Sequence, residues 1–161
     1  GLDFCQPMLD QAIIKSKGRG SPSNLKFLLG DCLNLPFDDA SFDAVTIAFG
    51  LRNLEDRGRG LSEMLRVLRP GGRLLVLEFS KPFLLLRPFY FLYLHAVLPV
   101  LAWLITRDRK AYQYLGSSIH GFPDRKGLTK EFLEAGFAKV EVASLTGAIV
   151  AIHSAEKSAS D

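Results

Sequence analysis

Residues 43–56, DAVTIAFGLRNLED, and 68–82, LRPGGRLLVLEFSKP, bound the stretch that decides the fold. It holds two apolar runs, 43–49 and 73–79, of the kind that form strands buried on both faces of a parallel sheet. Between them, apolar residues recur at helical spacing: Leu61, Met64, Leu65 and Leu68. The pattern predicts a β-α-β unit whose polar loop, 50–53, lies at the carboxyl end of the first strand, where ligands bind in open α/β sheets.

Composition predicts a single folded domain. The chain has 161 residues, of which 48% are hydrophobic and 23% charged, with a net charge of +3. Such a chain is long enough to bury a substantial core. The mild positive charge suits an ordinary solvated surface or attraction to anionic lipid, and it lacks the clustered basic stripe of a nucleic-acid-binding protein. We therefore expect no nucleic-acid partner.

Cysteines and histidines indicate neither a disulfide framework nor a metal site. The cysteines are Cys5 and Cys32, and the histidines His95, His120 and His153 are too scattered for ligand spacing,. The first residues have neither the charged leader nor the apolar region of a signal peptide. We expect a cytoplasmic protein, with peripheral attachment to the inner face of the membrane as the alternative.

The remaining elements are predicted from periodicity and from turn residues. A helix over 7–17 ends at Gly18, and a short buried strand follows at 25–29. The second half predicts helices at 110–119 and 124–135, then strands at 138–145 and 148–153 and a frayed polar tail at 155–161. The two strands form an antiparallel pair at the far edge of a mixed sheet.

Segment 83–105 consists mostly of apolar and aromatic residues, and it is long enough to span a membrane as a helix,. Arg87, His95, Pro88 and Pro99 interrupt it,. We interpret it first as one or two kinked helices that cover an apolar pocket. Contact with the bilayer surface is the second interpretation and a true span the third.

Acidic residues at two strand ends suggest a nucleoside ligand. Asp3 would accept hydrogen bonds from both ribose hydroxyls. Asp31 would accept from the adenine amine, and the backbone N–H of Cys32 would donate to a ring nitrogen. The alternative is that either carboxylate only caps the turn or helix that follows it.

Several stretches, in the right order, resemble one methyltransferase family. GDCLNLPFDDASFDAV (30–45) and LRPGGRLLVLE (68–78) resemble class I S-adenosylmethionine-dependent methyltransferases. More narrowly, FGLRN (49–53), LEFSKP (77–82), YQYLGSSI (112–119) and LTGAIVAIH (145–153) resemble the UbiE/COQ5 family of quinone C-methyltransferases. The resemblance implies a Rossmann-like α/β domain over 1–154, with 83–122 as an apolar substrate cover and 155–161 as a flexible tail.

The resemblance also implies the reaction and its partners. S-adenosylmethionine would methylate a carbon of a prenylated quinol, either demethylmenaquinol or a polyprenyl benzoquinol, in menaquinone or ubiquinone biosynthesis. Peripheral membrane contact through 83–105 and a homodimer are the partner options. The alternatives are a methyltransferase for another lipophilic acceptor and a non-catalytic quinone-binding subunit. A nicotinamide dehydrogenase is disfavoured, since no proton-donor signature follows.

Site residues carry over by position. Asp3 matches the ribose-binding acid of the family, and Asp31 and Cys32 match its adenine-side pair, which is Asn-Ala in many members. Ala48 matches a cofactor-contacting position that is often Ser, so its contact must come from the backbone.

Other positions match the acceptor side, with Arg52 and Asn53 expected to face the acceptor ring. The substrate-binding candidates are Tyr112, Tyr114, Ser118 and His120. The family often has its histidine two residues later, where this chain has Phe122, which favours a supporting role for His120.

The residue types at 52 and 53 suit this chemistry. A fixed guanidinium stabilises a phenolate as an oxyanion hole does. Because Arg stays protonated, a water held by Arg52 and Asn53 is the expected proton acceptor. The alternative is that Arg52 only pairs with Glu55 or Asp56.

Members of the family begin with a strand and a Gly-rich loop that approaches the cofactor. This chain starts where the second strand should end, so we expect an N-terminally truncated fold that lacks its central strand. Either the sequence is a fragment of a longer one, or rearrangement or a second copy of the chain completes the fold. Strand edges would then remain unpaired between 25–29 and 43–49. We expect the 161-residue chain alone to bind the cofactor weakly or not at all.

Overall fold

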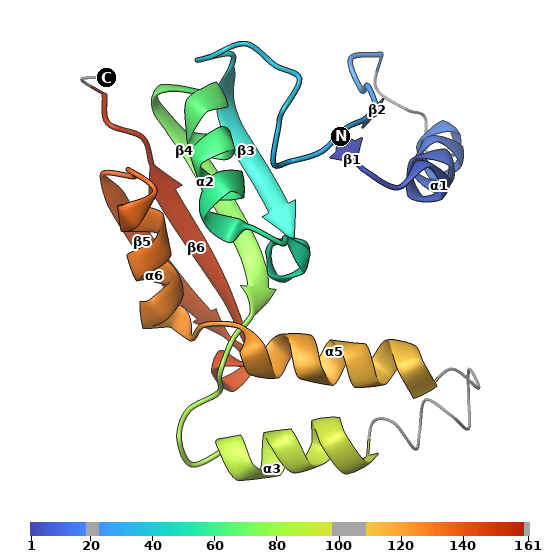
Figure 1. Ribbon diagram of the computed structural model, residues 1–161, viewed down its shortest axis with the longest axis vertical. Coiled ribbons are helices and arrows are strands. Elements are labelled where there is room, and N and C mark those ends of the chain that lie inside the picture. The colour runs from blue at the N-terminus through green and yellow to red at the C-terminus, as the bar shows by residue number, and fades with distance from the viewer. Residues whose placement is uncertain (19–22, 98–108, 160–161) are drawn as a thin grey trace.

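In the computed structural model, which describes residues 1–18, 23–97 and 109–159, the strands form two sheets (Figure 1). The smaller sheet pairs β1 (Leu2–Asp3) with β2 (Leu28–Leu29) in parallel. The larger sheet has the order β3-β4-β6-β5 and consists of β3 (Phe42–Ala48), β4 (Leu68–Phe79), β5 (Lys139–Leu145) and β6 (Val150–Glu156). The chain is therefore an α/β protein with a mixed sheet.

The N-terminal unit, residues 1–30, consists of β1, α1 (Gln6–Lys17) and β2. The predicted helix is confirmed, with Pro7 in its first turn and Gly18 at its end,. The predicted buried strand at 25–29 is wrong in length and in burial. Only Leu28 and Leu29 pair with β1, and they are 42% and 54% exposed. The reason is that a two-stranded sheet under one helix offers few neighbours to bury them.

The β-α-β unit predicted for 43–79 is confirmed. α2 (Arg57–Val67) connects β3 to β4, which pair in parallel. Asp56 begins the helix as its N-cap, because its carboxylate accepts the Arg59 backbone N–H at 2.9 Å,. β4 is longer than predicted, since the strand pairing already begins at Leu68.

The four-stranded sheet is covered on one face only, by α2 and α6 (Arg125–Glu134) (Figure 1). Leu74 and Val76 of β4 face these helices and are fully buried, whereas Leu75 between them is 38% exposed. The prediction that 43–49 and 73–79 are buried on both faces is therefore wrong for the described residues. Leu75 and its neighbours alternate in burial because, in the described part of the chain, the second face has no helix packed on it.

The antiparallel C-terminal strand pair is also confirmed. β6 lies between β4 and β5 and pairs antiparallel with both. A turn, η3 (Thr146–Ala148), joins β5 to β6, and its three residues all have positive φ. The prediction of a frayed tail from 155 is wrong: Ala155 is fully buried within β6. Lys157 then donates from Nζ to the carbonyls of Leu65 and Leu68, at 3.2 and 2.9 Å.

The apolar segment forms helices beyond the carboxyl end of β4. α3 (Arg87–Leu92) continues into a π-helical turn, η2 (Tyr93–Val97), and α5 (Arg109–Gly121) returns beside it (Figure 1). The helix predicted at 110–119 is thus confirmed, and the kink predicted within 83–105 is consistent with η2. Residues 98–105 lie outside the described residues. None of the described helices combines the length and apolar composition that crossing a bilayer requires.

Candidate active site

A strained residue begins the loop at the carboxyl end of β3. Phe49 has a φ of +53°, in the left-handed region that non-glycine residues rarely adopt,. Its N–H donates to the Leu77 carbonyl of β4 at 2.8 Å. The next turn, η1 (Leu51–Asn53), is anchored by the fully buried side chain of Leu51. Such strain persists where surrounding contacts over-determine the conformation, and it is frequent at functional sites.

Arg52 in this turn is held by Glu78 of β4. Its Nη1 lies 2.9 Å from Glu78 Oε1, and its backbone N–H donates to Oε2 at 3.3 Å. The same Nη1 donates to the Phe49 carbonyl at 2.6 Å. The side chains are 10% exposed for Arg52 and 1% for Glu78. The alternative that Arg52 pairs with Glu55 or Asp56 is therefore wrong, because its ion pair is with Glu78.

The Arg52 guanidinium keeps an unused donor. Its Nε is buried and has no hydrogen-bond partner among the described residues. The guanidinium carbon lies 5.3 Å from the centroid of the Phe79 ring, which in turn packs 4.9 Å from the Phe49 ring. A buried, unpaired N–H is costly unless an oxygen accepts from it. Nη2 likewise has no hydrogen-bond partner among the described residues, so the Nε–Nη2 edge of the guanidinium is the part left for an oxygen atom of a ligand.

Asn53 and Tyr114 meet beside this pair. The Tyr114 hydroxyl of α5 donates to Asn53 Oδ1 at 3.2 Å, and Asn53 Nδ2 donates to the Phe49 carbonyl at 3.4 Å. Tyr114 is more than half exposed. The fold thus brings together three of the residues that the sequence assigned to the acceptor side: Arg52, Asn53 and Tyr114.

The other acceptor-side candidates are not gathered in this cluster. Ser118 donates its hydroxyl to the Leu115 carbonyl, at 2.9 Å, within its own helix. His120 lies edge-on to the Phe91 ring, at 5.2 Å between centroids. Tyr112 belongs to α5, but its side chain lies outside the described residues. Phe122, at the position where the family often has histidine, is buried in the core.

The nucleoside-side candidates lie in and just after the N-terminal unit. Parallel pairing of β1 with β2 brings the ends of both strands to the same edge. Asp3 Oδ1 accepts the Cys5 N–H, and Asp31 Oδ1 accepts the Leu33 N–H, both at 2.8 Å. Each carboxylate thus caps a turn, as the alternative interpretation holds, through one of its two oxygens. The second oxygen of each remains an acceptor for a ligand.

Cys32 is close to both carboxylates. Burial raises the pKa of its thiol, and the negative charge of Asp31 and, more weakly, of Asp3 raises that pKa further. The thiol is therefore protonated at neutral pH. Its burial and acidic neighbours make it a poor nucleophile, so its expected contribution is through its backbone.

Ala48 ends β3 opposite Leu77 of β4. Its side chain has no polar atom, so only its backbone can contact a polar ligand. In Figure 1, the N-terminal unit stands apart from the four-stranded sheet, on the side of β3. Asp3 therefore comes from the N-terminal unit, whereas Ala48 shares β3 and the loop after it with Arg52 and Asn53.

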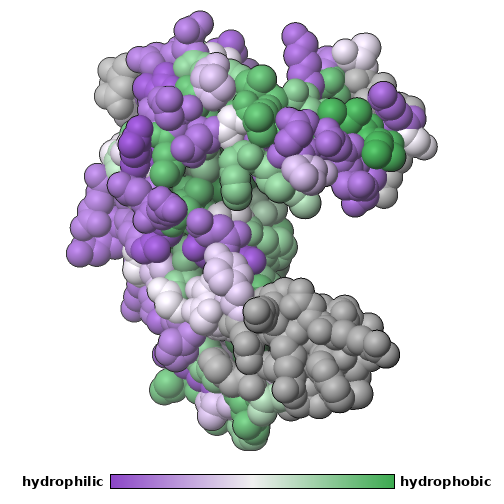
Figure 2. Space-filling view, turned by 45° about the vertical axis from the view of Figure 1, so that its right-hand side comes forward, coloured by the Kyte–Doolittle hydropathy of each residue, from purple (hydrophilic) through white to green (hydrophobic). Residues whose placement is uncertain are grey.

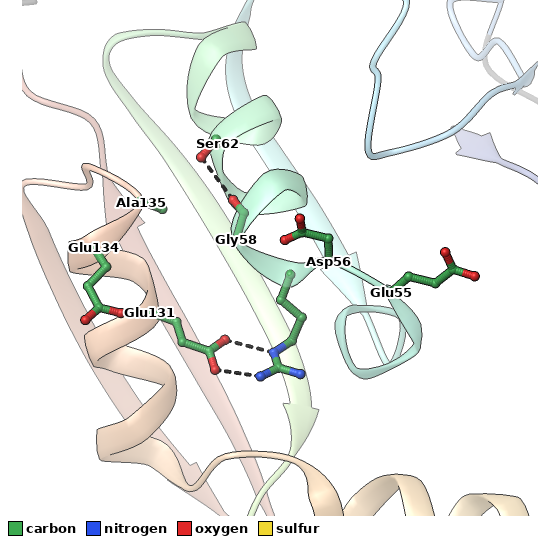
Figure 3. Close-up of a pocket in the computed structure, with 8 residues that line it drawn as sticks. Glu55, Asp56, Gly58, Ser62, Glu131, Glu134 and Ala135 are labelled. Atoms are coloured by element: carbon green, nitrogen blue, oxygen red, sulfur yellow. Dashed lines mark hydrogen bonds and ion pairs between the residues drawn. The ribbon is translucent and has the colours of Figure 1, made fainter.

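A cavity of about 480 Å³ lies elsewhere, between α2 and α6 (Figure 3). Arg57 crosses it to form two hydrogen bonds with Glu131, at 2.7 and 2.8 Å. Acidic residues line much of the rest: Glu55, Asp56 and Glu134. None of the predicted site residues lines this cavity, and the ion pair ties two helices together on the covered face of the sheet.

Two residues that contact Arg52 at the end of β3 were not predicted as site residues: Glu78 and Phe49. Glu78 had a signal, because a carboxylate at an inward-facing position of an apolar strand requires a partner. Phe49 had none, since its positive φ follows from contacts made by distant parts of the chain.

The sequence matches the family described as the ubiE/COQ5 methyltransferase family over residues 1–157. A demethylmenaquinone methyltransferase from Clavibacter sepedonicus is 45% identical over 158 residues, which cover 98% of this chain and 63% of that protein. A ubiquinone/menaquinone biosynthesis C-methyltransferase UbiE from Chromobacterium violaceum is 49% identical over 129 residues, covering 80% and 53%. The chain spans less than two thirds of the length of these curated relatives.

Solved structures share the fold at low sequence identity. A methyltransferase dependent on S-adenosylmethionine from Methanosarcina mazei has a TM-score of 0.64 at 22% identity, covering 98% of this chain and 81% of that one. The [4+2]-cyclase SpnF has a TM-score of 0.67 at 18% identity, covering 98% and 65%. Because a cyclase shares it, the fold alone does not define the reaction.

Proposed function

The chain belongs to the ubiE/COQ5 methyltransferase family, and from this premise we propose that the protein methylates a ring carbon of a prenylated quinol, with S-adenosylmethionine as the methyl donor. Demethylmenaquinol or a polyprenyl benzoquinol is the substrate class, in keeping with the names of its relatives. The observation that carries the proposal is the cluster of Arg52, Asn53 and Tyr114 at the carboxyl end of β3.

The nucleoside-side candidates are suited to holding the methyl donor, S-adenosylmethionine. Asp3 and Asp31 each keep a carboxylate oxygen free to accept hydrogen bonds, and both carboxylates lie near Cys32. In this proposal Asp3 binds the ribose hydroxyls, while Asp31 and the Cys32 backbone bind adenine. The Ala48 backbone contributes from the end of β3. The cofactor, when bound, supplies an electrophilic methyl group.

The acceptor-side residues would make the ring carbon nucleophilic. A hydroquinone carbon gains electron density as the neighbouring hydroxyl loses its proton, and the Arg52 guanidinium would stabilise the resulting oxyanion. Arg52 stays protonated, so a water held between Arg52 and Asn53 would accept the proton. Because the displacement is in line, orientation of the ring by Asn53 and Tyr114 would supply much of the acceleration.

Contact with a membrane is a further part of the proposal. The segment leading into and along α3 exposes large apolar side chains, including Leu84 at 78%, Leu85 at 82% and Phe89 at 70%. A contiguous apolar surface of this kind is typical of an interaction site, and a prenylated quinol resides in the bilayer. Peripheral binding through this surface would bring the site to its substrate.

Radiolabel transfer from S-adenosylmethionine tests the proposal. The protein is incubated with labelled S-adenosylmethionine and demethylmenaquinol, and with a sterol and a phospholipid as alternative acceptors. Labelling of the quinol alone is expected. Labelling of another lipid would indicate a methyltransferase with a different acceptor, and quinol binding without labelling would indicate a non-catalytic subunit; either outcome contradicts the proposal.

A vesicle-flotation experiment tests the membrane contact separately. The variant Leu84→Glu/Leu85→Glu is expected to lose flotation with anionic vesicles while its melting temperature stays unchanged, because both side chains are exposed. Met8→Glu is the control, since Met8 is also exposed but lies on α1. Equal flotation of all three proteins would contradict a role for this surface.

A further inference from the structure

Glu78 is a charged side chain within the hydrophobic face of β4. It lies on the same face of the strand as Leu74 and Val76, and like them it is shielded from solvent. Taking a carboxylate out of water is costly unless hydrogen bonds and an opposite charge compensate for it. An apolar residue would pack at this position without that cost, so the carboxylate calls for an explanation beyond packing.

Within the described part of the chain, the hydrogen bonds to this carboxylate all come from the loop–strand junction of the site. Oε1 accepts from Arg52 Nη1 and from the Phe79 N–H, both at 2.9 Å. Oε2 accepts the Arg52 backbone N–H at 3.3 Å. The Glu78 carboxylate therefore binds both the backbone N–H and the guanidinium of Arg52. The first contact fixes the turn and the second fixes the guanidinium.

Further contacts restrict how the guanidinium is turned. Nη1 also donates to the Phe49 carbonyl, and the Phe79 ring lies beneath the group. With Nη1 engaged twice, Nε and Nη2 of Arg52 are the donors without a partner among the described residues, and they form one edge of the guanidinium. The same Phe49 carbonyl accepts from Asn53, whose side chain meets Tyr114. The carboxylate thus holds Arg52 directly, and Asn53 and Tyr114 join Arg52 through the shared Phe49 carbonyl.

We propose that Glu78 is a positioning residue for methyl transfer: its buried carboxylate fixes the Arg52 guanidinium so that the unpaired edge of that group faces the ionising oxygen of the quinol. This inference rests on the proposed function. Glu78 acts only through Arg52 and touches neither substrate nor cofactor. Without the carboxylate, the guanidinium turns away from the oxygen and the quinol ionises less readily.

The test compares Glu78→Gln with the wild-type full-length protein across a pH series. A misplaced guanidinium is expected to lower kcat at neutral pH by roughly 10- to 100-fold, with little change in KM for S-adenosylmethionine. Arg52 no longer favours the ionised quinol in this variant, so the apparent pKa of the ascending limb of kcat rises. The deficit is therefore expected to shrink as the pH increases, whereas a merely structural defect lowers kcat equally at every pH.

Two further variants complete the design. Glu78→Asp keeps the charge on a shorter side chain, and it is expected to restore part of the activity and of the pH profile. It also carries the test if Glu78→Gln fails to fold. The matched control is Glu131→Gln, since Glu131 also forms a two-point ion pair with an arginine, Arg57, away from the candidate site. Its pH profile is expected to match that of the wild type.

The outcomes separate the two hypotheses. A wild-type protein that methylates the quinol, together with a Glu78→Gln profile parallel to that of the wild type, overturns the positioning role and leaves the proposed function standing. A wild-type protein that methylates no quinol overturns the proposed function and this inference with it. A loss of kcat in Glu131→Gln with the same pH dependence as in Glu78→Gln also overturns the positioning role, because the effect is then not specific to the ion pair with Arg52.

Discussion

The four-stranded sheet and the N-terminal unit are both built from strands and helices, but they differ sharply in burial. The sheet packs against α2 and α6 around a continuous core that includes Leu61, Leu74 and Phe132, all fully buried. Among the described residues of the N-terminal unit, Leu9 alone is buried, and Phe4 is 79% exposed. The same local patterns therefore produce a stable core only where a large sheet gives them neighbours.

The space-filling view shows the surface that results from this difference. In Figure 2, apolar residues are exposed in the hollow between the N-terminal unit and the rest of the molecule. The connection to α2 runs through 31–41: Arg59 Nε donates to the Leu33 carbonyl, and Arg66 donates to the carbonyls of Leu35 and Phe37. These polar contacts are exposed or half-buried, and regions with few buried apolar contacts open first. Of the nucleoside-side candidates, Asp3 is thus on the less stable unit, whereas Cys32 packs against the core and Ala48 belongs to β3.

The largest expected effect comes from truncating a core side chain. Phe132→Ala removes a fully buried ring of α6 and is expected to lower the free energy of unfolding by about 3–5 kcal/mol,. The matched change Phe4→Ala in the N-terminal unit is expected to stay within about 0.5 kcal/mol of the wild type, since Phe4 is exposed. Urea denaturation measures both. Similar losses from the two substitutions would contradict the contrast between the two units.

The next effect is a loss of stability at acidic pH, centred on the sheet. His153 of β6 is buried against Phe132, and burial, with a smaller contribution from the charge of Arg125, lowers its pKa below the ordinary value of 6.5. Above about pH 6.5 the imidazole is neutral in both states. Below it the unfolded chain binds the proton first, so stability falls by up to about 1.4 kcal/mol per pH unit until the folded pKa is reached.

Denaturation at pH 7 and pH 5 checks this expectation. The variant His153→Leu is expected to lose less stability than the wild type between the two values, because it has no group to protonate at that position. His120→Gln serves as the control, since His120 is exposed. An unchanged pH dependence in His153→Leu would show that other groups cause the acid sensitivity.

The smallest expected effects come from changes at helix N-caps, and they differ between the four-stranded sheet and the N-terminal unit. Asp56→Ala removes the N-cap bond of α2 and is expected to cost about 1 kcal/mol of global stability,. At the matching position of α1, Cys5 makes no side-chain cap bond. Cys5→Ser supplies a hydroxyl that can accept one, and it is expected to slow hydrogen exchange of α1 amides by several-fold. Equal slowing throughout β4 would contradict the local independence of α1.

Much of the fold could be predicted from local pattern. The helix of 7–17, the β-α-β unit of 43–79 and the antiparallel pair at the C-terminus all follow from periodicity and turn residues, and the structure has them. The errors concern burial: 25–29, the second face of β4 and Ala155. Each depends on which elements pack against a strand, and hydrophobicity along one segment does not specify its neighbours.

The candidate site divides in the same way. The strand pattern placed the loop 50–53 at the ligand-binding edge of an open α/β sheet, and the resemblance then identified Arg52, Asn53 and Tyr114 as acceptor-side residues. The sequence did not predict the ion pair between Arg52 and Glu78, because these residues are far apart in the chain. Glu55 and Asp56 are closer in sequence and were the expected partners. Pairing of β3 with β4 decided between them by placing the two strand ends side by side.

The sequence by itself determined most of the secondary structure, the crossover connection, the family and the residue types available for the proposed methyl transfer. Those properties depend on local backbone preference and on the spacing of side chains along one element. Only the tertiary structure decided that Glu78 is buried, that it orients Arg52, and that Phe49 adopts a strained conformation between them. The physical reason is that a buried charge is tolerated only where its partners converge from separate elements, and that convergence is a property of the packed sheet.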